Sequence, residues 1–467
     1  MSESEVLERL DETVAAWDNG FGIWPQMTTS DRIAKIELVV EKLLEKRQVM
    51  IDVLMLEIGK NYVDAASEID RTITFIRQSI TLLKSSTPQK KTYGTTITYT
   101  SLLPIGIILS LGPSNYPLNE TYAMILPALL TGNTVIMKIP AVGGLVHLLT
   151  IDIFNSILPK GTLSFISGGG RVTCPPIMLT GKIDGLAFIG SSKAADSLIK
   201  THPEPHRLKV FSQLEAKNMG IFFADGIEEG LNEAVKGSFS YNGQRCTALK
   251  ILWVPRGGRE VFERLFKEKV EGLKVGLPWD GMDVNEPSDI TPLPPGRVEY
   301  MKELIDDAQS KGANIYGGEI VGGSESRLMK PAVVFGVEEE MRLWEEEQFG
   351  PIAVVKYYED LEEVLEYGKV GKYAQQVSIF TKEGKGVEEL TDKFRNIFGK
   401  ININVAAGRS PDELAFSGRR SSAMGTMSVR HALEAFTTET VLATKEGKGE
   451  EIFERVLKES KFGEAVV

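Results

Sequence analysis

Cysteine is nearly absent from this chain, because its 467 residues contain only Cys174 and Cys246. Two widely separated cysteines cannot supply the disulfide framework of a secreted domain, which indicates a reducing compartment. Blocks of lysine and arginine are also absent, and the formal net charge is −11. This charge balance argues against nucleic acid or an anionic membrane as a partner, while it still allows a local basic pocket for an anionic substrate.

Long hydrophobic runs are missing too. The most apolar stretches, LLPIGIILSLG and YAMILPALLTG, are short and are interrupted by proline and glycine, so we predict no transmembrane helix. The N-terminal segment MSESEVLERLDETVAAWDNG is acidic and amphipathic, unlike a signal or transit peptide, and we expect a cytoplasmic protein. A chain of this length predicts two or three domains.

Short β-branched runs alternate with helical patterns over most of the chain. Residues 1–90 have apolar positions at helical spacing, whereas residues 104–225 alternate between strand and helix patterns. This alternation predicts a parallel sheet covered by helices, and it resumes after Cys246 as a second α/β domain. Residues 91–102 predict a hairpin-like strand pair, and the tail from about residue 440 predicts a strand followed by an exposed helix.

Cys246 lies in the segment SYNGQRCTALK. A single cysteine is often a small buried hydrophobe, and the sequence leaves that interpretation open. The glycine and glutamine before Cys246 suit a tight, partly exposed turn, and the adjacent Arg245 favours the reactive thiolate. Cys246 is therefore a candidate nucleophile, and such a nucleophile needs an oxyanion stabiliser and a proton acceptor.

Asn115 is the candidate stabiliser. It lies in LGPSNYPLNETYAMILP, between a predicted strand and a predicted helix start, where its amide could donate to a developing oxyanion. The alternative is an asparagine that only caps or turns the chain.

The glycine-rich fingerprint of dinucleotide-binding proteins is absent, and SGGG at 167–170 matches it only weakly. A better candidate is FIGSSKAAD, in which Gly190 and Ser191 end a strand and open a helix whose N-terminus suits a pyrophosphate. Lys138 in NTVIMKIPA stands at a predicted strand end, where ligands of parallel sheets gather.

Taken in order, a set of segments resembles the aldehyde dehydrogenase superfamily over about residues 30–440. These segments are PSNYPL, GNTVIMKIPA, FIGSS, SQLEAKN, GQRC, EEEQFGP and GKININ. Within the superfamily, SEIDRT, SNYP, YNGQRCTA, RSPD and EAFTTET are similar to segments of the non-phosphorylating, NADP-dependent glyceraldehyde-3-phosphate dehydrogenases.

The resemblance implies an α/β fold with a Rossmann-type cofactor domain, an α/β catalytic domain and a small β element for oligomerisation. We expect the cofactor domain at 1–88 and 104–217, and the catalytic domain at 218–439. Residues 89–103 and 440–467 would form the oligomerisation element and the tail. The matching elements pair subunits in relatives, and a long edge strand without a partner is a liability, so we expect a homodimer or homotetramer.

The resemblance also implies roles for single residues. Cys246 would attack the aldehyde carbon to give a hemithioacetal, Asn115 and the backbone N–H of Cys246 would hold the oxyanion, and water would hydrolyse the later thioester. Residues facing the cofactor would be Lys138 and Ala141 at the adenosine ribose, Gly190 and Ser191 at the pyrophosphate, and Glu347 and Phe349 at the nicotinamide riboside. Many NAD-specific relatives carry a carboxylate at the position of Ala141, so NADP is expected, with NAD as the alternative. No metal is expected.

Substrate choice rests on arginines in this family. The residues that match its phosphate and substrate contacts are Arg71, Tyr116, Arg245, Thr247 and Arg409. Three guanidinium groups around one pocket would suit a phosphate dianion, because each offers forked donors. The resemblance therefore implies irreversible, NADP-dependent oxidation of D-glyceraldehyde 3-phosphate to 3-phosphoglycerate, a glycolytic conversion.

One position departs from the family pattern. The family's general base is a glutamate, and alignment on Lys217 places Gln213 there, with Glu215 two residues later. If this segment is a strand, both side chains share a face, and Glu215 is our candidate base. One alternative is that another group, or water alone, deacylates the thioester. Another is that the acyl group is passed to coenzyme A instead of water, and a third is that the chain is inactive. Oxidation of another small aldehyde or semialdehyde, and a non-enzymatic scaffold protein, also stay open.

Overall fold

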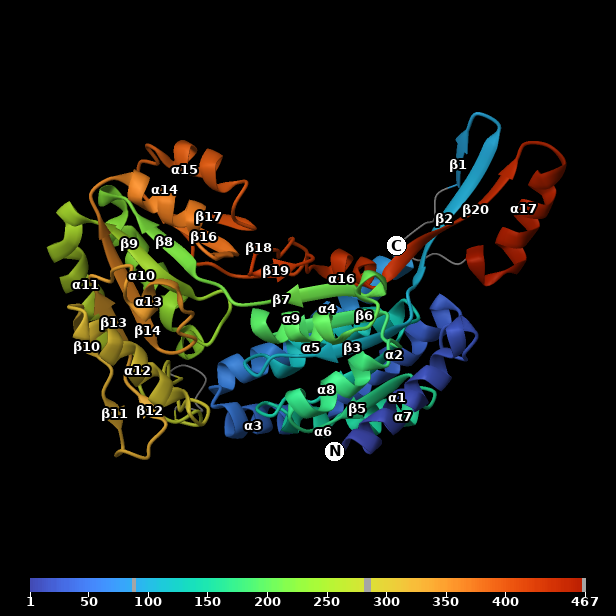
Figure 1. The fold of residues 1–467 in the computed structure, drawn as a ribbon, viewed down its shortest axis with the longest axis horizontal. Helices are drawn as coiled ribbons and strands as arrows, with labels where there is room; N and C mark the ends of the chain where they lie inside the picture. The colour runs from blue at the N-terminus through green and yellow to red at the C-terminus, as the bar shows by residue number, and fades with distance from the viewer. Residues whose placement is uncertain (86–89, 281–286, 464–467) are drawn as a thin grey trace.

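The structure is a computed structural model that describes residues 1–85, 90–280 and 287–463. Two large sheets, each packed with helices, form two lobes, and a three-stranded antiparallel arm projects from the first lobe (Figure 1). The α/β fold class predicted from the sequence is therefore confirmed. None of the helices within these ranges combines the length and the apolarity that crossing a bilayer requires.

The first sheet has the strand order β19-β7-β6-β3-β4-β5, and only β19 runs antiparallel to its neighbour. Its strands are β3 (Ile107–Leu111), β4 (Thr134–Lys138), β5 (Leu163–Ile166), β6 (Gly185–Ile189), β7 (Lys209–Gln213) and β19 (Ala423–Met424). The helices of this lobe are α1 (Glu3–Trp17), α2 (Thr29–Glu45), α3 (Arg47–Ile58), α4 (Tyr62–Ser85), α5 (Pro117–Leu130), α6 (Leu145–Leu148), α7 (Ile151–Ile157), α8 (Gly170–Leu179), α9 (Ser192–Thr201) and α16 (Val429–Ala435).

The side chains of β3 alternate between two cores, as the period of a strand requires. Ile107 and Leu109 pack in one buried cluster with residues of α1 and α8, whereas Ile108 packs in another with residues of α2, α4 and α5. Both faces of the sheet are therefore covered, which explains why its strands read as continuous apolar runs rather than alternating ones.

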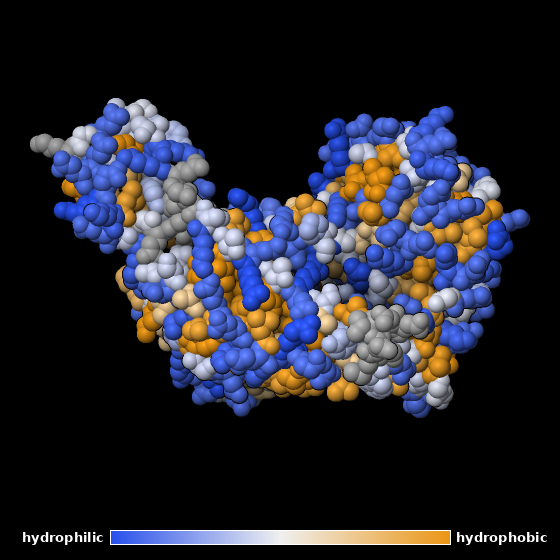
Figure 2. All heavy atoms as spheres, turned by 180° about the vertical axis from the view of Figure 1, so that it is seen from behind, coloured by the Kyte–Doolittle hydropathy of each residue, from blue (hydrophilic) through white to orange (hydrophobic). Residues whose placement is uncertain are grey.

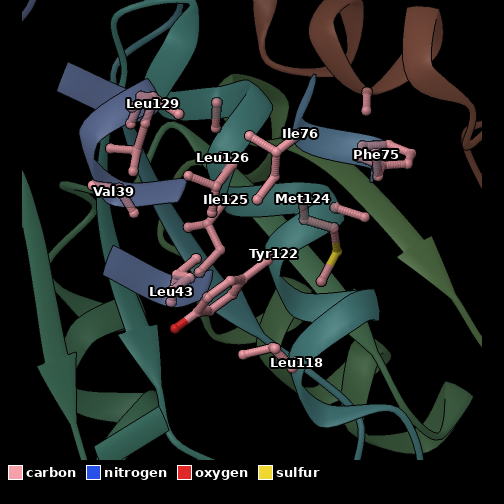
Figure 3. Packing of buried hydrophobic residues seen from close by; sticks show 14 of the residues in the cluster. Val39, Leu43, Phe75, Ile76, Leu118, Tyr122, Met124, Ile125, Leu126 and Leu129 are labelled. Atoms are coloured by element: carbon pink, nitrogen blue, oxygen red, sulfur yellow. The ribbon is translucent and has the colours of Figure 1, made fainter. Parts of the chain in front are cut away.

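Helix α5 lies inside the larger of these cores. Its apolar side chains pack against α2 and α4, as Figure 3 shows with Val39, Leu43, Phe75, Ile76, Leu118, Tyr122, Met124, Ile125, Leu126 and Leu129. Each fully buried side chain of this size contributes about 1.5–3 kcal/mol. The helix is therefore a rigid support for the loop that precedes it, which carries Asn115.

The N-terminus of α5 is capped by a carboxylate from another helix. Glu68 Oε1 accepts hydrogen bonds from the backbone nitrogens of Leu118 at 2.9 Å and Asn119 at 3.2 Å, and Oε2 pairs with the buried ammonium of Lys60. A negative charge at a helix N-terminus is stabilised by the orphan amides and the helix dipole. This buried network fixes the direction in which α5 leaves the Asn115 loop.

The second sheet has the order β10-β13-β14-β9-β8-β16-β17, and only β10 runs antiparallel to its neighbour. Its strands are β8 (Asn218–Phe222), β9 (Leu249–Pro255), β10 (Asn314–Gly317), β13 (Ala332–Phe335), β14 (Ile352–Tyr358), β16 (Gln376–Phe380) and β17 (Lys400–Ile403). Its main helices are α10 (Ile227–Phe239), α11 (Arg259–Glu271), α12 (Arg297–Ser310), α13 (Arg342–Glu345), α14 (Leu361–Val370) and α15 (Val387–Phe394).

The two lobes exchange chain segments. Residues 214–217 connect β7 of the first sheet to β8 of the second. Later in the sequence, β19 and α16 return to the first lobe from within the range 218–439, which was expected to form only the catalytic domain. Two short pairs, β11 (Ile320–Val321) with β12 (Leu328–Met329) and β15 (Tyr373–Ala374) with β18 (Arg419–Arg420), lie outside the main sheets.

The arm consists of β1 (Lys90–Tyr93), β2 (Thr96–Pro104) and β20 (Thr437–Lys445), all antiparallel. Helix α17 (Lys448–Glu459) packs on it through a small core that contains Ile97, Tyr99 and Phe453. Seen from behind, the arm stands away from the body, and the outline of the molecule is concave between the arm and the second lobe (Figure 2). The strand pair and the helix expected at these positions are both present.

Three strands of the first sheet end at residues that the sequence singled out. β4 ends at Lys138, β7 ends at Gln213, and Gly190 follows β6 directly. Ser191 is the N-cap of α9, and its hydroxyl accepts from the backbone nitrogen of Ala194 at 3.4 Å. The carboxyl edge of a parallel sheet is where ligands bind in folds of this kind, so these residues mark the side of the sheet on which to look for a site.

Candidate active site

A cavity of about 730 Å³ opens between the two lobes. Every residue that the sequence marked as a catalytic, substrate-binding or cofactor-binding candidate lines it. They are Arg71, Asn115, Tyr116, Lys138, Ala141, Gly190, Ser191, Glu215, Arg245, Cys246, Thr247, Glu347, Phe349 and Arg409. The fold thus joins segments that lie hundreds of positions apart. Within the described ranges, no group of three or more His, Cys, Asp or Glu side chains is arranged to hold a metal ion.

The loop that presents Cys246 has an unusual backbone. Tyr241, Asn242 and Gly243 adopt φ values of 48°, 56° and 64°, all in the left-handed region. Gly243 is required here, because a Cβ would lie 2.5 Å from the Gly350 carbonyl oxygen. Left-handed non-glycine residues store strain and persist only where their surroundings hold them.

Buried side chains hold this loop in place. Lys250 Nζ donates to the Gly243 carbonyl at 2.8 Å, and Asn218 Nδ2 donates to the Cys246 carbonyl at 2.7 Å. Asn242 Nδ2 donates to Gln244 Oε1 at 3.0 Å. The position of the sulfur is therefore determined by a hydrogen-bonded framework rather than by a mobile turn.

Asn115 lies beside the same loop. Its buried Nδ2 donates to the backbone carbonyl of Gln244 at 2.8 Å, two residues before Cys246. Because an amide nitrogen carries two hydrogens, one donor remains for an oxyanion formed at the sulfur. The cavity lining thus brings the asparagine and the cysteine together as an oxyanion hole would need.

The half-buried Cys246 is protonated in the free protein. Burial, together with the charges of Glu120 and Glu347, raises the pKa of its thiol to about 12 against the opposing effects of Arg245 and Arg409. Arg245 lowers the pKa of Cys246, in the direction expected from its position, but desolvation outweighs a single neighbouring cation. The nucleophile must lose its proton after other groups enter the cavity.

This pKa predicts how the free protein reacts with iodoacetamide. The thiolate fraction of Cys246, and hence its alkylation rate, is expected to rise about tenfold per pH unit from about pH 7 to about pH 9 without a plateau. Arg245→Met removes a cation that lowers the pKa and therefore slows alkylation, whereas Arg256→Met on the surface leaves it unchanged. Mass spectrometry of the Cys246 peptide measures both rates, and a plateau below about pH 9 would contradict the assignment.

Two of the arginines already have carboxylate partners. Arg71 Nε and Nη2 donate to Asp412 at 2.8 and 2.6 Å, while Arg409 pairs with Glu120 and lies 3.3 Å from Asp412. Arg245 has a weaker partner, since its Nη1 donates to the hydroxyl of Ser240 at 2.7 Å. The positive charge around the cavity is thus partly neutralised. Arg245 is the one of these three arginines that has no carboxylate partner among the described residues.

Glu347 occupies a buried, mixed-charge corner of the cavity. Its carboxylate lies 3.8 Å from Lys250 Nζ, and its Oε1 is buried without a hydrogen-bond partner. Burial raises the pKa of Glu347, and the positive charge of Lys250 opposes that change. Phe349, at φ 29°, places its ring 4.9 Å from Lys250 Nζ. An unpartnered buried acceptor next to an aromatic ring is suited to a ligand with hydroxyl groups.

The other end of the cavity fits a dinucleotide. Lys138 is 8% exposed, and no hydrogen bond or ion pair to its ammonium is found among the described residues. Ala141 offers no carboxylate to an adenosine ribose, and at Gly190 a Cβ would lie 2.8 Å from the ring of Phe188. A cation without a partner among the described residues, an uncharged neighbour and a glycine that allows close approach suit a phosphate-bearing ligand.

Glu215 is placed differently from the expectation. β7 ends at Gln213, so Glu215 lies in the connection to β8 rather than on a strand, although both residues line the cavity. Its Oε2 accepts from the backbone nitrogen of Ser192 at 2.7 Å, at the N-terminus of α9. Gln213 is buried, and its Oε1 has no partner. The helix amide attracts the carboxylate for the same reason that it would attract a phosphate.

The lining residues missed from the sequence include Glu120 and Arg297. Glu120 is the only charged residue of the apolar helix α5, and that isolated charge was a usable signal. Arg297 Nη2 donates to the carbonyls of Gln348 at 3.3 Å and Phe349 at 2.9 Å, so it supports the segment that carries Glu347. Nothing in the sequence near Arg297 pointed to this role.

Comparison with known proteins shows the family of this chain. The family model described as "Aldehyde dehydrogenase family" matches residues 4–442. This chain belongs to the aldehyde dehydrogenase family. Membership makes it an NAD(P)-dependent aldehyde dehydrogenase, and the resemblance inferred from the sequence is confirmed.

Several aldehyde dehydrogenases of known name are similar to this one. An NADP-dependent glyceraldehyde-3-phosphate dehydrogenase of Streptococcus equinus is 28% identical over 442 residues, covering 92% of this chain and 90% of its own length. The lactaldehyde dehydrogenase of Methanococcus vannielii is 26% identical, covering 90% of this chain and 89% of its own. The crystal structure of the NADP-dependent glyceraldehyde-3-phosphate dehydrogenase from Bacillus halodurans with NADP superimposes with a TM-score of 0.86 at 27% identity, covering 96% of this chain and 92% of that one.

Proposed function

We propose that this aldehyde dehydrogenase oxidises D-glyceraldehyde 3-phosphate to 3-phosphoglycerate with NADP. The observation that carries the proposal is the presence of Arg71, Arg245 and Arg409 in the cavity that holds Cys246. One guanidinium nitrogen, Arg409 Nη2, is buried without a partner. Guanidinium groups recognise phosphate through forked donors, so an anionic end on the aldehyde would satisfy this orphan.

The chemistry begins at the sulfur. Deprotonated Cys246 attacks the carbonyl carbon, and the resulting oxyanion accepts hydrogen bonds from Asn115 Nδ2 and from the backbone N–H of Cys246. When bound, NADP supplies the acceptor for the hydride of the adduct. The acyl group then stays on sulfur as a thioester, and attack by water releases the acid and returns the thiol. Each turnover consumes one aldehyde, one water and one NADP⁺, and releases one carboxylate, one NADPH and two protons.

We assign contacts with NADP to the cavity residues whose chemistry suits each part of the cofactor. Lys138 would hold the adenosine ribose or its 2′-phosphate, Ala141 leaves room for that phosphate, and Gly190 with Ser191 would face the pyrophosphate. Glu347 and Phe349 would hold the nicotinamide riboside. Support comes from Lys138, a largely buried lysine without a hydrogen bond or ion pair among the described residues, and from Glu347 Oε1, which is buried without a hydrogen-bond partner. NAD remains the alternative cofactor.

Glu215 is the proposed base that activates the deacylating water. It lines the cavity, and it is close enough to Glu347 for its charge to raise the pKa of that carboxyl. To act on a thioester, the Glu215 carboxylate must leave the Ser192 amide. A pyrophosphate that binds at the same helix N-terminus would compete for that amide and so favour the release of the carboxylate.

Thr247 and Tyr116 complete the proposed substrate pocket. The arm is the proposed surface through which subunits pair.

A second candidate is oxidation of an unphosphorylated hydroxyaldehyde. It is favoured by the carboxylates that already partner Arg71 and Arg409, and by the likeness to an enzyme named for lactaldehyde. Such a substrate would need hydroxyl contacts rather than free cations. The two candidates therefore differ in what the arginines do during substrate binding.

Steady-state kinetics of NADPH formation separates them. We expect kcat/KM for D-glyceraldehyde 3-phosphate to exceed that for glyceraldehyde at least about 100-fold, because unpaired buried donors penalise a substrate that lacks the matching acceptor. Arg245→Met should reduce this ratio, while the surface variant Arg256→Met should preserve it. Equal or better use of glyceraldehyde by the unaltered enzyme would refute the assignment of the phosphorylated substrate.

A further inference from the structure

The arginine cluster beside Cys246 contains two carboxylates with unequal attachments. Asp412 is 9% exposed at its side chain and is shared, since both Arg71 and Arg409 contact it. Its pKa is lowered: burial acts to raise it, but the hydrogen bond from Arg71 and the two positive charges prevail. Asp412 is therefore a fixed part of the framework that holds the two guanidinium groups side by side.

Fewer contacts hold the Glu120 carboxylate in place than hold that of Asp412. Among the described residues its direct ion pair is with Arg409, through Oε2, while its charge also acts on the guanidinium of Arg71 without direct contact. Its Oε1 accepts a long hydrogen bond of 3.4 Å from Asn119 Nδ2. The side chain is 17% exposed and lines the cavity. Its charge also reaches the nucleophile, because after burial it is the largest influence that raises the pKa of the Cys246 thiol. Glu120 thus contributes a carboxylate to the lining of the cavity that holds Cys246.

Arg409 has donors that these partners do not use. Its Nη2 is buried and has no acceptor, and the side chain as a whole is 5% exposed. A phosphate that satisfied Nη2 would lie beside Nη1, where the Glu120 carboxylate already sits. Two anions on one guanidinium repel each other, so the carboxylate must yield or the phosphate must bind more weakly.

We propose that Glu120 is a specificity-determining residue that competes with the substrate's phosphate for Arg409. In this role Glu120 weakens binding of phosphorylated aldehydes and leaves unphosphorylated aldehydes unaffected. The inference rests on the proposed function, because it concerns the same pocket and its phosphate contacts. It adds a residue whose carboxylate opposes the phosphate preference that the arginines create.

The test uses Glu120→Gln in the full-length protein. Glutamine has nearly the same shape and keeps an oxygen for Arg409, but it carries no charge. Glu413→Gln is the matched control, since Glu413 is exposed, contacts Gln78 and does not line the cavity. KM is measured for D-glyceraldehyde 3-phosphate and for glyceraldehyde, and inorganic phosphate is used as a competitor of both. The alkylation rate of Cys246 by iodoacetamide is measured without aldehyde or cofactor.

We expect Glu120→Gln to lower KM for D-glyceraldehyde 3-phosphate and the inhibition constant of inorganic phosphate about tenfold each. KM for glyceraldehyde should stay within about twofold of the original. Alkylation of Cys246 should be faster, because an anion that raises its pKa is gone. Glu413→Gln should change none of these. A second variant, Glu120→Met, must shift phosphate binding in the same direction, which guards against an effect peculiar to glutamine.

Failure of this inference differs from failure of the proposed function. If the unaltered enzyme does not prefer the phosphorylated aldehyde, the proposed function is wrong, yet the phosphate inhibition constants still test Glu120. If the unaltered enzyme has that preference but Glu120→Gln binds phosphate no more tightly, the competitor role of Glu120 is overturned. Phosphate binding that weakens in both Glu120 variants would instead mean that the carboxylate positions Arg409 for the ligand, and would also overturn the inference.

Discussion

Cys246→Ala is expected to reduce aldehyde-dependent NADPH formation to background. Loss of an enzymatic nucleophile costs about 10⁶ in kcat where it has been measured in a hydrolase, and no other cysteine lines the cavity. The substitution removes only the sulfur, so Asn218 can still bind the backbone carbonyl of residue 246. Steady-state assays at saturating aldehyde and NADP measure the effect.

Cys174→Ala is the matched control. Cys174 is fully buried in α8, within the core cluster on the other side of the first sheet. Burial raises the pKa of its thiol, which keeps it protonated and unreactive. This variant should keep its activity and lose a little thermal stability through a small cavity. Retained turnover in Cys246→Ala would remove sulfur from the mechanism altogether.

Glu215→Gln is expected to separate the two halves of the reaction. Acylation does not need this carboxylate, so a burst of NADPH stoichiometric with enzyme should remain. Turnover after the burst should fall by about 10²–10⁴, the usual contribution of a general base. Glutamine still offers an oxygen to the Ser192 amide, so α9 keeps its cap. Rapid-quench kinetics distinguishes the burst from the steady state.

Gln213 supplies the companion experiment. It is buried with a free side-chain oxygen at the position where relatives are expected to carry the base. A Gln213→Glu change placed in the Glu215→Gln background should therefore restore part of the turnover. If Glu215→Gln turns over as fast as the unaltered enzyme, the base lies elsewhere, and Glu347, whose pKa burial raises, is the next candidate. Turnover that depends on added coenzyme A would instead favour an acyl-transferring enzyme.

The fold could be predicted from the sequence because the patterns that indicate its strands and helices are local. Strands β3, β4 and β6 are short, mainly apolar runs, of which β3 and β6 are followed by glycine and β4 ends at a lone lysine, and a helix comes after each. The ends of such strands meet at one edge of a parallel sheet. This is why Lys138 and Ser191 could be assigned to one cavity before any coordinates were known.

The electrostatic details were not accessible, because they depend on contacts between distant segments. Glu120 and Arg409 are 289 positions apart, and no spacing rule pairs them. The high pKa of Cys246 depends on burial by both lobes, whereas the sequence displays only the neighbouring arginine. Glu215 does not lie on the strand expected to carry both it and Gln213, because β7 ends at Gln213 and the chain crosses to the second sheet.

Direct capture of the acyl enzyme is the sharpest measurement. Glu215→Gln is mixed with NADP and D-glyceraldehyde 3-phosphate, quenched in acid during the steady state, digested and analysed by mass spectrometry. We expect a 3-phosphoglyceryl thioester on the Cys246 peptide and none on the Cys174 peptide. Formation of NADPH with Cys246 unmodified, or acylation of any other side chain, would contradict the assignment of Cys246 as the nucleophile.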